Sequence, residues 1–292
     1  MASSTSPTTG SSPSASGPED IVPESLKVAF SASKDAKLLT VHGIDGVGCS
    51  WLTARLLGDW LRNCTFDPAT GKCDIGIVVC SYQHSLEYYI GHLQPFGIDL
   101  AWHVEQGHVK FLGSQFENII ADSKAAPSTL PHVTFDASLA LLGDLAGEMR
   151  TTFDRTVLFL DNPEMGMALT TDDDDVRIER WLLAVDNATY NYDNAVVSMV
   201  VDFAQPLHSP VSRLTSDAAT SAISTLNVNA QMAVTVRPNN GMIGSGRDGR
   251  VSIVYRMDYP EDLDNDSGER HEEDHNIQVG SGGRVDFVGE TY

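Results

Sequence analysis

A short apolar run, a glycine loop and an amphipathic run follow one another between Lys37 and Asn63, and this succession constrains the fold more than any other feature of the chain. The loop reads Gly-Ile-Asp-Gly-Val-Gly-Cys-Ser from Gly43 to Ser50. A phosphate-binding loop has a glycine, four residues, a second glycine, a lysine and then serine or threonine. Gly43, Gly48 and Ser50 match that pattern. The sequence therefore predicts a strand, a loop related to phosphate-binding loops, and a helix.

Cys49 stands where the phosphate-binding pattern has its lysine. The lysine ammonium is the mobile cation that stabilises the charge on the β- and γ-phosphates during phosphoryl transfer. A thiol is shorter, and near neutral pH it is uncharged or anionic. We therefore interpret the loop as a degenerate nucleotide loop and expect no ATP hydrolysis, with an ordinary turn between strand and helix as the alternative.

A second apolar run, Thr156–Leu160, ends in Asp161. This is the layout of a Walker B strand, whose carboxylate holds Mg²⁺. The distance of Asp161 from the glycine loop, with a strand and a helix expected between them, matches the arrangement of RecA-type domains. Buried strands that end in aspartate are common, so an ordinary strand end without a metal role is the alternative for Asp161.

Predicted strands alternate with predicted helices from Leu38 onward, and the pattern changes beyond Leu226 to β-runs separated by glycine turns. The first strands are expected at Leu38–His42, Ile75–Cys80, Val109–Leu112, Thr156–Leu160 and Ala195–Phe203, and the later β-runs at Met232–Arg237, Val251–Tyr255 and Arg284–Val288. Alternation of this kind indicates a mostly parallel sheet with helices on both faces. We predict an α/β, RecA-like (P-loop NTPase-type) fold with degenerate Walker motifs and a β-rich C-terminal extension.

The composition of two segments predicts that they are disordered. Residues 1–24 are rich in serine, threonine and proline and bury too little apolar surface to offset their ordering entropy. Asp258–Asp274 holds nine acidic residues and one base, and its charges repel one another. We therefore expect a tail over 1–24, one RecA-like domain over 25–257, an acidic loop over 258–278, and a last strand of the same domain within 279–292.

The formal net charge of −21 predicts that the chain alone repels a phosphate backbone. A contact with nucleic acid then needs a local basic patch or basic partner subunits. Arg247 and Arg250 lie in a glycine-rich turn and are candidate contacts for RNA or a partner; a solvated hairpin tip is the alternative.

The four cysteines and the apolar pattern suggest a reduced, non-membrane protein. Cys49, Cys64, Cys73 and Cys80 lack the spacing of a zinc site, and reduced thiols are the simplest interpretation, with a Cys64–Cys73 disulfide as the alternative. No apolar run approaches the length of a bilayer span, and the N-terminus lacks the pattern of a signal peptide. We expect no metal site and no membrane partner.

Four segments together resemble subunit six of the Elongator complex (the Elongator protein 6 family). They are Leu39–Leu61, Val79–His84 with the helix up to Gly97, Val157–Glu164, and the C-terminal β-hairpin from Met232 to Val254. The resemblance implies a non-catalytic RecA-like subunit, a pseudo-ATPase without catalytic residues of its own. It implies a hetero-hexameric ring with Elongator subunits four and five that joins the catalytic subcomplex, binds tRNA and supports wobble-uridine tRNA modification in cytoplasm and nucleus.

Two alternatives to this function stay open on the sequence. One is an active P-loop NTPase or kinase whose lysine comes from elsewhere; Lys72 and Lys110 are the mid-core lysines at hand. The other is a stand-alone RecA-like scaffold without a link to RNA. We expect no cofactor, although the retained Gly43, Ser50 and Asp161 leave room for residual ATP binding at a subunit interface.

Overall fold

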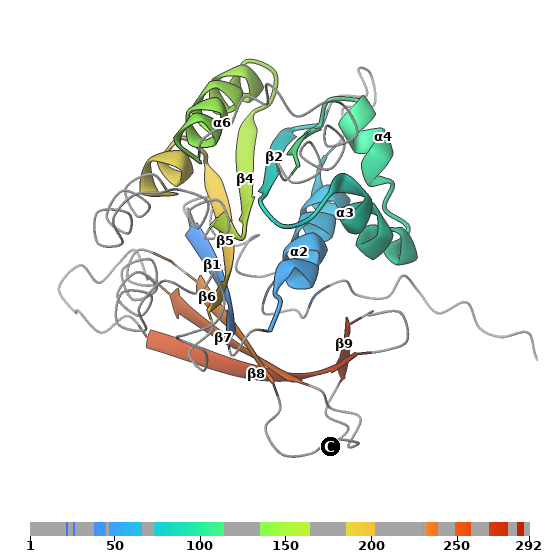
Figure 1. Cartoon of the computed structure of the whole chain (residues 1–292), viewed down its shortest axis with the longest axis vertical. Coiled ribbons are helices and arrows are strands. Elements are labelled where there is room, and N and C mark those ends of the chain that lie inside the picture. Colours follow the sequence, from blue (N-terminus) through green and yellow to red (C-terminus); the bar gives the residue numbers. More distant parts are fainter. Residues whose placement is uncertain are drawn as a thin grey trace, which may run out of the picture.

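The computed structural model describes residues 22, 26, 38–44, 47–65, 73–113, 135–163, 185–201, 230, 232–238, 249–257, 269–279 and 285–288 of the 292-residue chain. Its strands form one nine-stranded sheet in the order β3-β2-β4-β5-β1-β6-β7-β8-β9 (Figure 1). These strands are β1 (Leu38–Ile44), β2 (Ile75–Ser81), β3 (Val109–Leu112), β4 (Arg155–Asp161), β5 (Asn194–Val201), β6 (Met232–Pro238), β7 (Gly249–Met257), β8 (Glu269–Val279) and β9 (Val285–Val288).

The pairing changes direction at β6, as the sequence predicts. All pairs from β3 to β6 are parallel, and the pairs β6–β7, β7–β8 and β8–β9 are antiparallel. Parallel neighbours need crossover connections, whereas antiparallel ones are joined by short turns. The predicted α/β class with a mostly parallel sheet and a β-rich C-terminal extension is confirmed.

Helices cover both faces of the parallel part of the sheet (Figure 1). The helices in the described ranges include α2 (Ser50–Asn63), α3 (Leu86–Leu93), the short 3₁₀ helix η1 (Gln94–Phe96), α4 (Leu100–Glu105) and α6 (Phe135–Arg150). Helix α2 packs on β4 and β5, whereas α6 packs on β2 and β4 from the opposite face. None of the helices in the described ranges is long and apolar enough to cross a bilayer.

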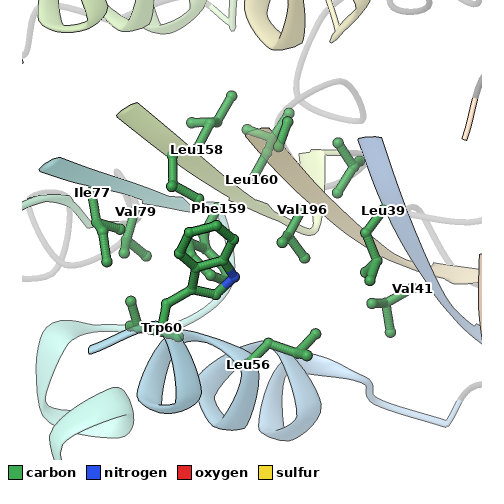
Figure 2. Packing of buried hydrophobic residues seen from close by; sticks show 14 of the residues in the cluster. Leu39, Val41, Leu56, Trp60, Ile77, Val79, Leu158, Phe159, Leu160 and Val196 are labelled. Carbon is green, nitrogen blue, oxygen red and sulfur yellow. The ribbon is translucent and has the colours of Figure 1, made fainter. Parts of the chain in front are cut away.

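Alternate residues of β4 pack against the two helical layers (Figure 2). Phe159 lies beside Trp60 on the α2 side, while Leu158 and Leu160 point to the other side. All these side chains are at most 5% exposed, and burying a large apolar side chain contributes about 1.5–3 kcal/mol. The helix predicted after the glycine loop is therefore confirmed, but every residue of α2 from Ser50 to Leu61 is buried, so it is enclosed on all sides and does not leave one face exposed.

The C-terminal strands curl back so that β9 lies near α2 (Figure 1). The rings of Phe287 on β9 and Trp51 on α2 are 5.8 Å apart, centroid to centroid. Arg55 is 5% exposed, and its guanidinium carbon lies 5.7 Å from the ring centroid of Trp51, 5.6 Å from that of Phe287 and 4.8 Å from that of Phe96. Attraction between a guanidinium and aromatic faces helps to offset the cost of burying the charge. This contact anchors the antiparallel extension to the parallel core.

The acidic loop predicted over 258–278 is wrong for its second half. Strand β8 covers Glu269–Val279, and its residues from Glu269 to Asp274 lie in register with Met257 to Ser252 of β7. Pairing with β7 satisfies the backbone of β8 along one edge, and a strand edge tolerates charged side chains such as the exposed Asp274. Residues 258–268 lie outside the described part of the chain.

The disordered tail predicted over 1–24 is corrected at Val22. Val22 is 1% exposed and belongs to the hydrophobic core, as does Leu26, which is fully buried. Apolar residues thus enter the core before the position where the sequence predicts the domain to begin. The other residues of 1–24 lie outside the described ranges.

Candidate functional site

The glycine loop connects β1 to α2, as predicted, and its backbone folds closely onto Gly43. A Cβ atom at Gly43 would lie 1.8 Å from the carbonyl oxygen of Val47, so only glycine is tolerated there. A Cβ at Gly48 would meet no described atom within 4 Å. The first glycine of the motif is therefore required by the close approach of the loop backbone, whereas the second is not required by packing against the described residues.

Cys49, at the lysine position, points into the sheet. Its side chain is fully buried. The sulfur lies 3.3 Å from the carbonyl oxygen of Met199 on β5 and 3.9 Å from that of Val41 on β1, and the thiol donates to both. The Cys49 carbonyl oxygen accepts from the Leu52 amide at the start of α2. Cys49 thus joins β1, β5 and α2 where a phosphate-binding loop would have a cation.

Sheet register brings the predicted Asp161 next to two serines. Ser81 on β2 pairs with Asp161 on β4, and Asp161 pairs with Ser198 on β5. Ser81 and Asp161 end their strands and Ser198 lies in the middle of β5, and all three are on the face that α2 covers. Their side chains are at most 1% exposed.

Five donors surround the Asp161 carboxylate. Oδ1 accepts from Ser50 Oγ at 3.0 Å, Ser198 Oγ at 2.7 Å and Asn162 Nδ2 at 3.2 Å, and Oδ2 accepts from Ser81 Oγ at 3.0 Å and Tyr89 Oη at 2.7 Å. A carboxylate has about four lone-pair sites, so its acceptor capacity is filled. Burial, and then the charge of Asp161, raise the pKa of Tyr89 well above its ordinary value, so this hydroxyl keeps the proton it donates.

Asn162 holds an unusual backbone conformation beside this network. Its φ is 53°, which is uncommon for a residue other than glycine. Its Nδ2 lies 2.9 Å from Ser50 Oγ and 2.6 Å from Gln83 Oε1, and its backbone amide donates to the Ser198 carbonyl oxygen at 2.7 Å. Oδ1 of the same side chain is buried without a partner among the described residues. These bonds hold the strained residue in place and link β4 to β5 and to the start of α2.

Every side chain that donates to Asp161 is uncharged, and the nearest histidine offers no cation at neutral pH. Burial lowers the pKa of His84 below its ordinary value, against the opposing effect of Asp161. His84 stacks on Tyr88 with ring centroids 3.8 Å apart. A magnesium–nucleotide complex requires a mobile cation and a free carboxylate oxygen. Cys49 does not supply the cation, and the oxygens of Asp161 already accept five hydrogen bonds. The residues present therefore do not fit that complex, and no group of three metal-ligating side chains occurs among the described residues.

The structure brings most of the predicted site residues together. Gly43, Cys49, Ser50 and Asp161 meet at the carboxyl edge of the sheet, and Gly48 lies in the same loop. Arg247 lies outside the described residues. Arg250 opens β7 and pairs with Arg237 of β6, whose neighbour Val236 pairs with Gly43 of β1. The backbone of Arg250 is therefore at the same edge as the loop, two strands away.

Sequence reasoning missed the donors that make the site a network. Ser81 ends an apolar run and Ser198 interrupts one, and a polar residue two positions after a core residue keeps the same face. That spacing was the available signal for both serines. Nothing in the sequence indicates that the hydroxyl of Tyr89 reaches Asp161.

Replacing Asp161 with alanine tests whether the network is structural. Four buried hydroxyls would lose their acceptor, so we expect the free energy of unfolding to fall by roughly 3 kcal/mol in chemical denaturation. Ser198→Ala removes one donor only and should cost about 1 kcal/mol. An Asp161→Ala chain that is as stable as the natural one would contradict a structural role for the carboxylate.

Comparisons with known proteins support the fold. No family model and no curated protein sequence matches the chain. The structure is similar to the flagellar accessory protein FlaH from Methanocaldococcus jannaschii, with a TM-score of 0.51, 13% identity and coverage of 91% of this chain and 96% of FlaH. It is also similar to the KaiC-like protein PH0186 from Pyrococcus horikoshii OT3, with a TM-score of 0.50, 10% identity and coverage of 87% of this chain and 91% of that one. At such identities the likeness concerns the fold alone, and the chain has a RecA-like fold.

Proposed function

We propose that this chain is a non-catalytic RecA-like subunit of the Elongator complex. The observation that carries the proposal is the thiol of Cys49, fully buried and bonded to the sheet where an active phosphate loop has an ammonium. The five donors on Asp161 support it further, because a carboxylate used in this way has no free oxygen for a metal ion. Residual ATP binding at a subunit interface stays a prediction.

The proposed role is assembly into a hetero-hexameric ring with Elongator subunits four and five. The ring would join the catalytic subcomplex, bind tRNA and support wobble-uridine modification in cytoplasm and nucleus. The net charge of −21 requires that tRNA binding depends on local arginines or on partner subunits. Arg237 is exposed and its backbone pairs with that of Arg250 at the loop edge, so Arg237 is a candidate for such an arginine.

An active NTPase or kinase is the alternative, and the bond between Ser50 and Asp161 favours it. In an active site the serine and the aspartate of the two Walker motifs both hold the Mg²⁺ ion, and here they are 3.0 Å apart. A lysine from elsewhere in the chain would have to complete the site. Lys110 is on β3 at the far edge of the sheet, 3.3 Å from Glu148 Oε1, and Lys72 lies outside the described residues.

Affinity purification of the tagged chain from the cells that make it tests the proposed membership. We expect Elongator subunits four and five, with the catalytic subcomplex, to co-purify in constant ratio, and the purified proteins to assemble into a hetero-hexamer by analytical ultracentrifugation. A well-behaved monomer without affinity for subunits four and five would contradict the proposal and favour a stand-alone scaffold.

Neutralising Arg247 and Arg250 together tests the proposed RNA contact. In the assembled ring we expect Arg247→Ala/Arg250→Ala to weaken tRNA binding and to flatten its log–log salt slope by about one to two units, because one or two phosphate contacts vanish. Arg150→Ala, at an exposed position on the last turn of α6, is the matched control. Unchanged tRNA affinity and salt slope in the double variant would mean that these arginines are solvated at a hairpin tip and do not contact RNA.

A further inference from the structure

Two cysteines that the proposed function does not use lie side by side below α2. Cys64 caps the C-terminal end of α2, and Cys73 lies two residues before β2. Two hydrogen bonds hold the intervening ends of the chain together: the Thr65 amide donates to Asp74 Oδ1 at 2.8 Å, and the Asp74 amide donates to the Thr65 carbonyl oxygen at 3.0 Å. The backbone therefore fixes the two cysteines as neighbours.

The two thiol groups are unequal. The Cys64 thiol donates to the Leu61 carbonyl oxygen at 3.0 Å, whereas the Cys73 sulfur lies 3.8 Å from Asp74 Oδ1. Interaction with the neighbouring Cys64 thiol lowers the pKa of Cys73, although burial and Asp74 oppose the shift. Interaction with Cys73, together with burial, raises the pKa of Cys64. The Ile75 amide also approaches the Cys73 sulfur, at 3.5 Å. Cys73 is thus the better nucleophile of the pair, because the thiolate is the reactive form.

The other two cysteines provide an internal contrast. The thiol of Cys49 lies against backbone carbonyl oxygens of the sheet. Cys80 lies within β2, and burial raises the pKa of its thiol to about 12. Cys64, in contrast, is flanked by the exposed Asn63 and Thr65, so this pair lies just below the surface. All four cysteines are free in this structure.

We propose that Cys64 and Cys73 form a reversible redox pair that closes to a disulfide when a peroxide is present. The Cys73 thiolate attacks one peroxide oxygen and becomes a sulfenic acid while hydroxide leaves. The Cys64 sulfur then attacks the Cys73 sulfur, and its proton leaves with the expelled hydroxide as water. In sum, two thiols and one hydrogen peroxide give one disulfide and two waters.

The bond would tie the end of α2 to the start of β2. These elements supply Ser50 and Ser81 to Asp161 at their other ends, so oxidation would stiffen the frame that carries the site. The sulfurs must approach to about 2.05 Å, and the two Thr65–Asp74 hydrogen bonds hold together the residues that follow the two cysteines in the chain. A disulfide that closes the short loop from Cys64 to Cys73 should raise the melting temperature of the protein by about 5 °C.

Peptide mapping of the full-length protein after hydrogen peroxide tests the pair. The remaining thiols are blocked with N-ethylmaleimide under denaturing conditions before digestion with trypsin, which cuts after Arg62, Lys72 and Lys110 and so separates Cys64 from Cys73. We expect peptide 63–72 linked to peptide 73–110, with Cys80 and Cys49 carrying the maleimide, and a reducing agent should release the link. Labelling of all four cysteines, or a link that involves Cys49 or Cys80, would overturn the proposal.

Single serine variants test the order of the two steps. In Cys64→Ser the sulfenic acid on Cys73 has no resolving thiol, so dimedone should trap it. In Cys73→Ser we expect at least tenfold less dimedone adduct on Cys64, because this thiol keeps its proton. Equal adducts in the two variants would contradict the assignment of Cys73 as the attacking group. The peptide map of the natural chain decides the existence of the pair even if a variant does not fold.

Discussion

The buried carboxylate of Asp161 is the interaction on which the central part of this structure depends. Burying a carboxylate away from water costs free energy unless hydrogen bonds satisfy its oxygens. Here the donors come from the start of α2, the end of β2, the middle of α3 and the middle of β5, so the charge can be buried only when these elements are all in place. The network specifies how the helices on one face sit on the parallel strands, and Cys49 adds a further link between β1, β5 and α2.

The same positions are those at which a P-loop enzyme handles phosphate. The loop keeps the close approach that requires Gly43, and Ser50 keeps its contact with Asp161. The difference lies in what these polar groups contact. The hydroxyls donate to the carboxylate and the thiol lies against the sheet, so the polar groups stabilise the fold. This use of the site supports the non-catalytic part of the proposed role, and the Elongator part rests on the resemblance of the four sequence segments.

The sequence predicted the parallel core because its strands are continuous apolar runs and its helices have leucine and tryptophan at helical spacing. It also located Cys49, Ser50 and Asp161, since motif spacing fixes where loop and strand ends fall. Strand β8 was not predicted because its acidic residues argue against a strand, and pairing with β7 overrides that local preference. Val22 was missed because one apolar residue in a polar tail has no periodicity. The hydroxyl of Tyr89 was missed because only tertiary packing places it on Asp161.

Substituting lysine for Cys49 tests the central claim most directly, because it restores the motif while challenging the buried thiol position. The account predicts that Cys49→Lys lowers the free energy of unfolding by about 2 kcal/mol or more, since an ammonium must be buried or forced out of its site. Cys49→Ala, the size control, should cost about 1 kcal/mol. Neither the natural chain nor Cys49→Lys should hydrolyse ATP above a protein-free control. A Cys49→Lys chain that is fully stable and turns over ATP, with turnover lost on adding Asp161→Ala, would contradict the account and show an enzyme site that lacks only its lysine.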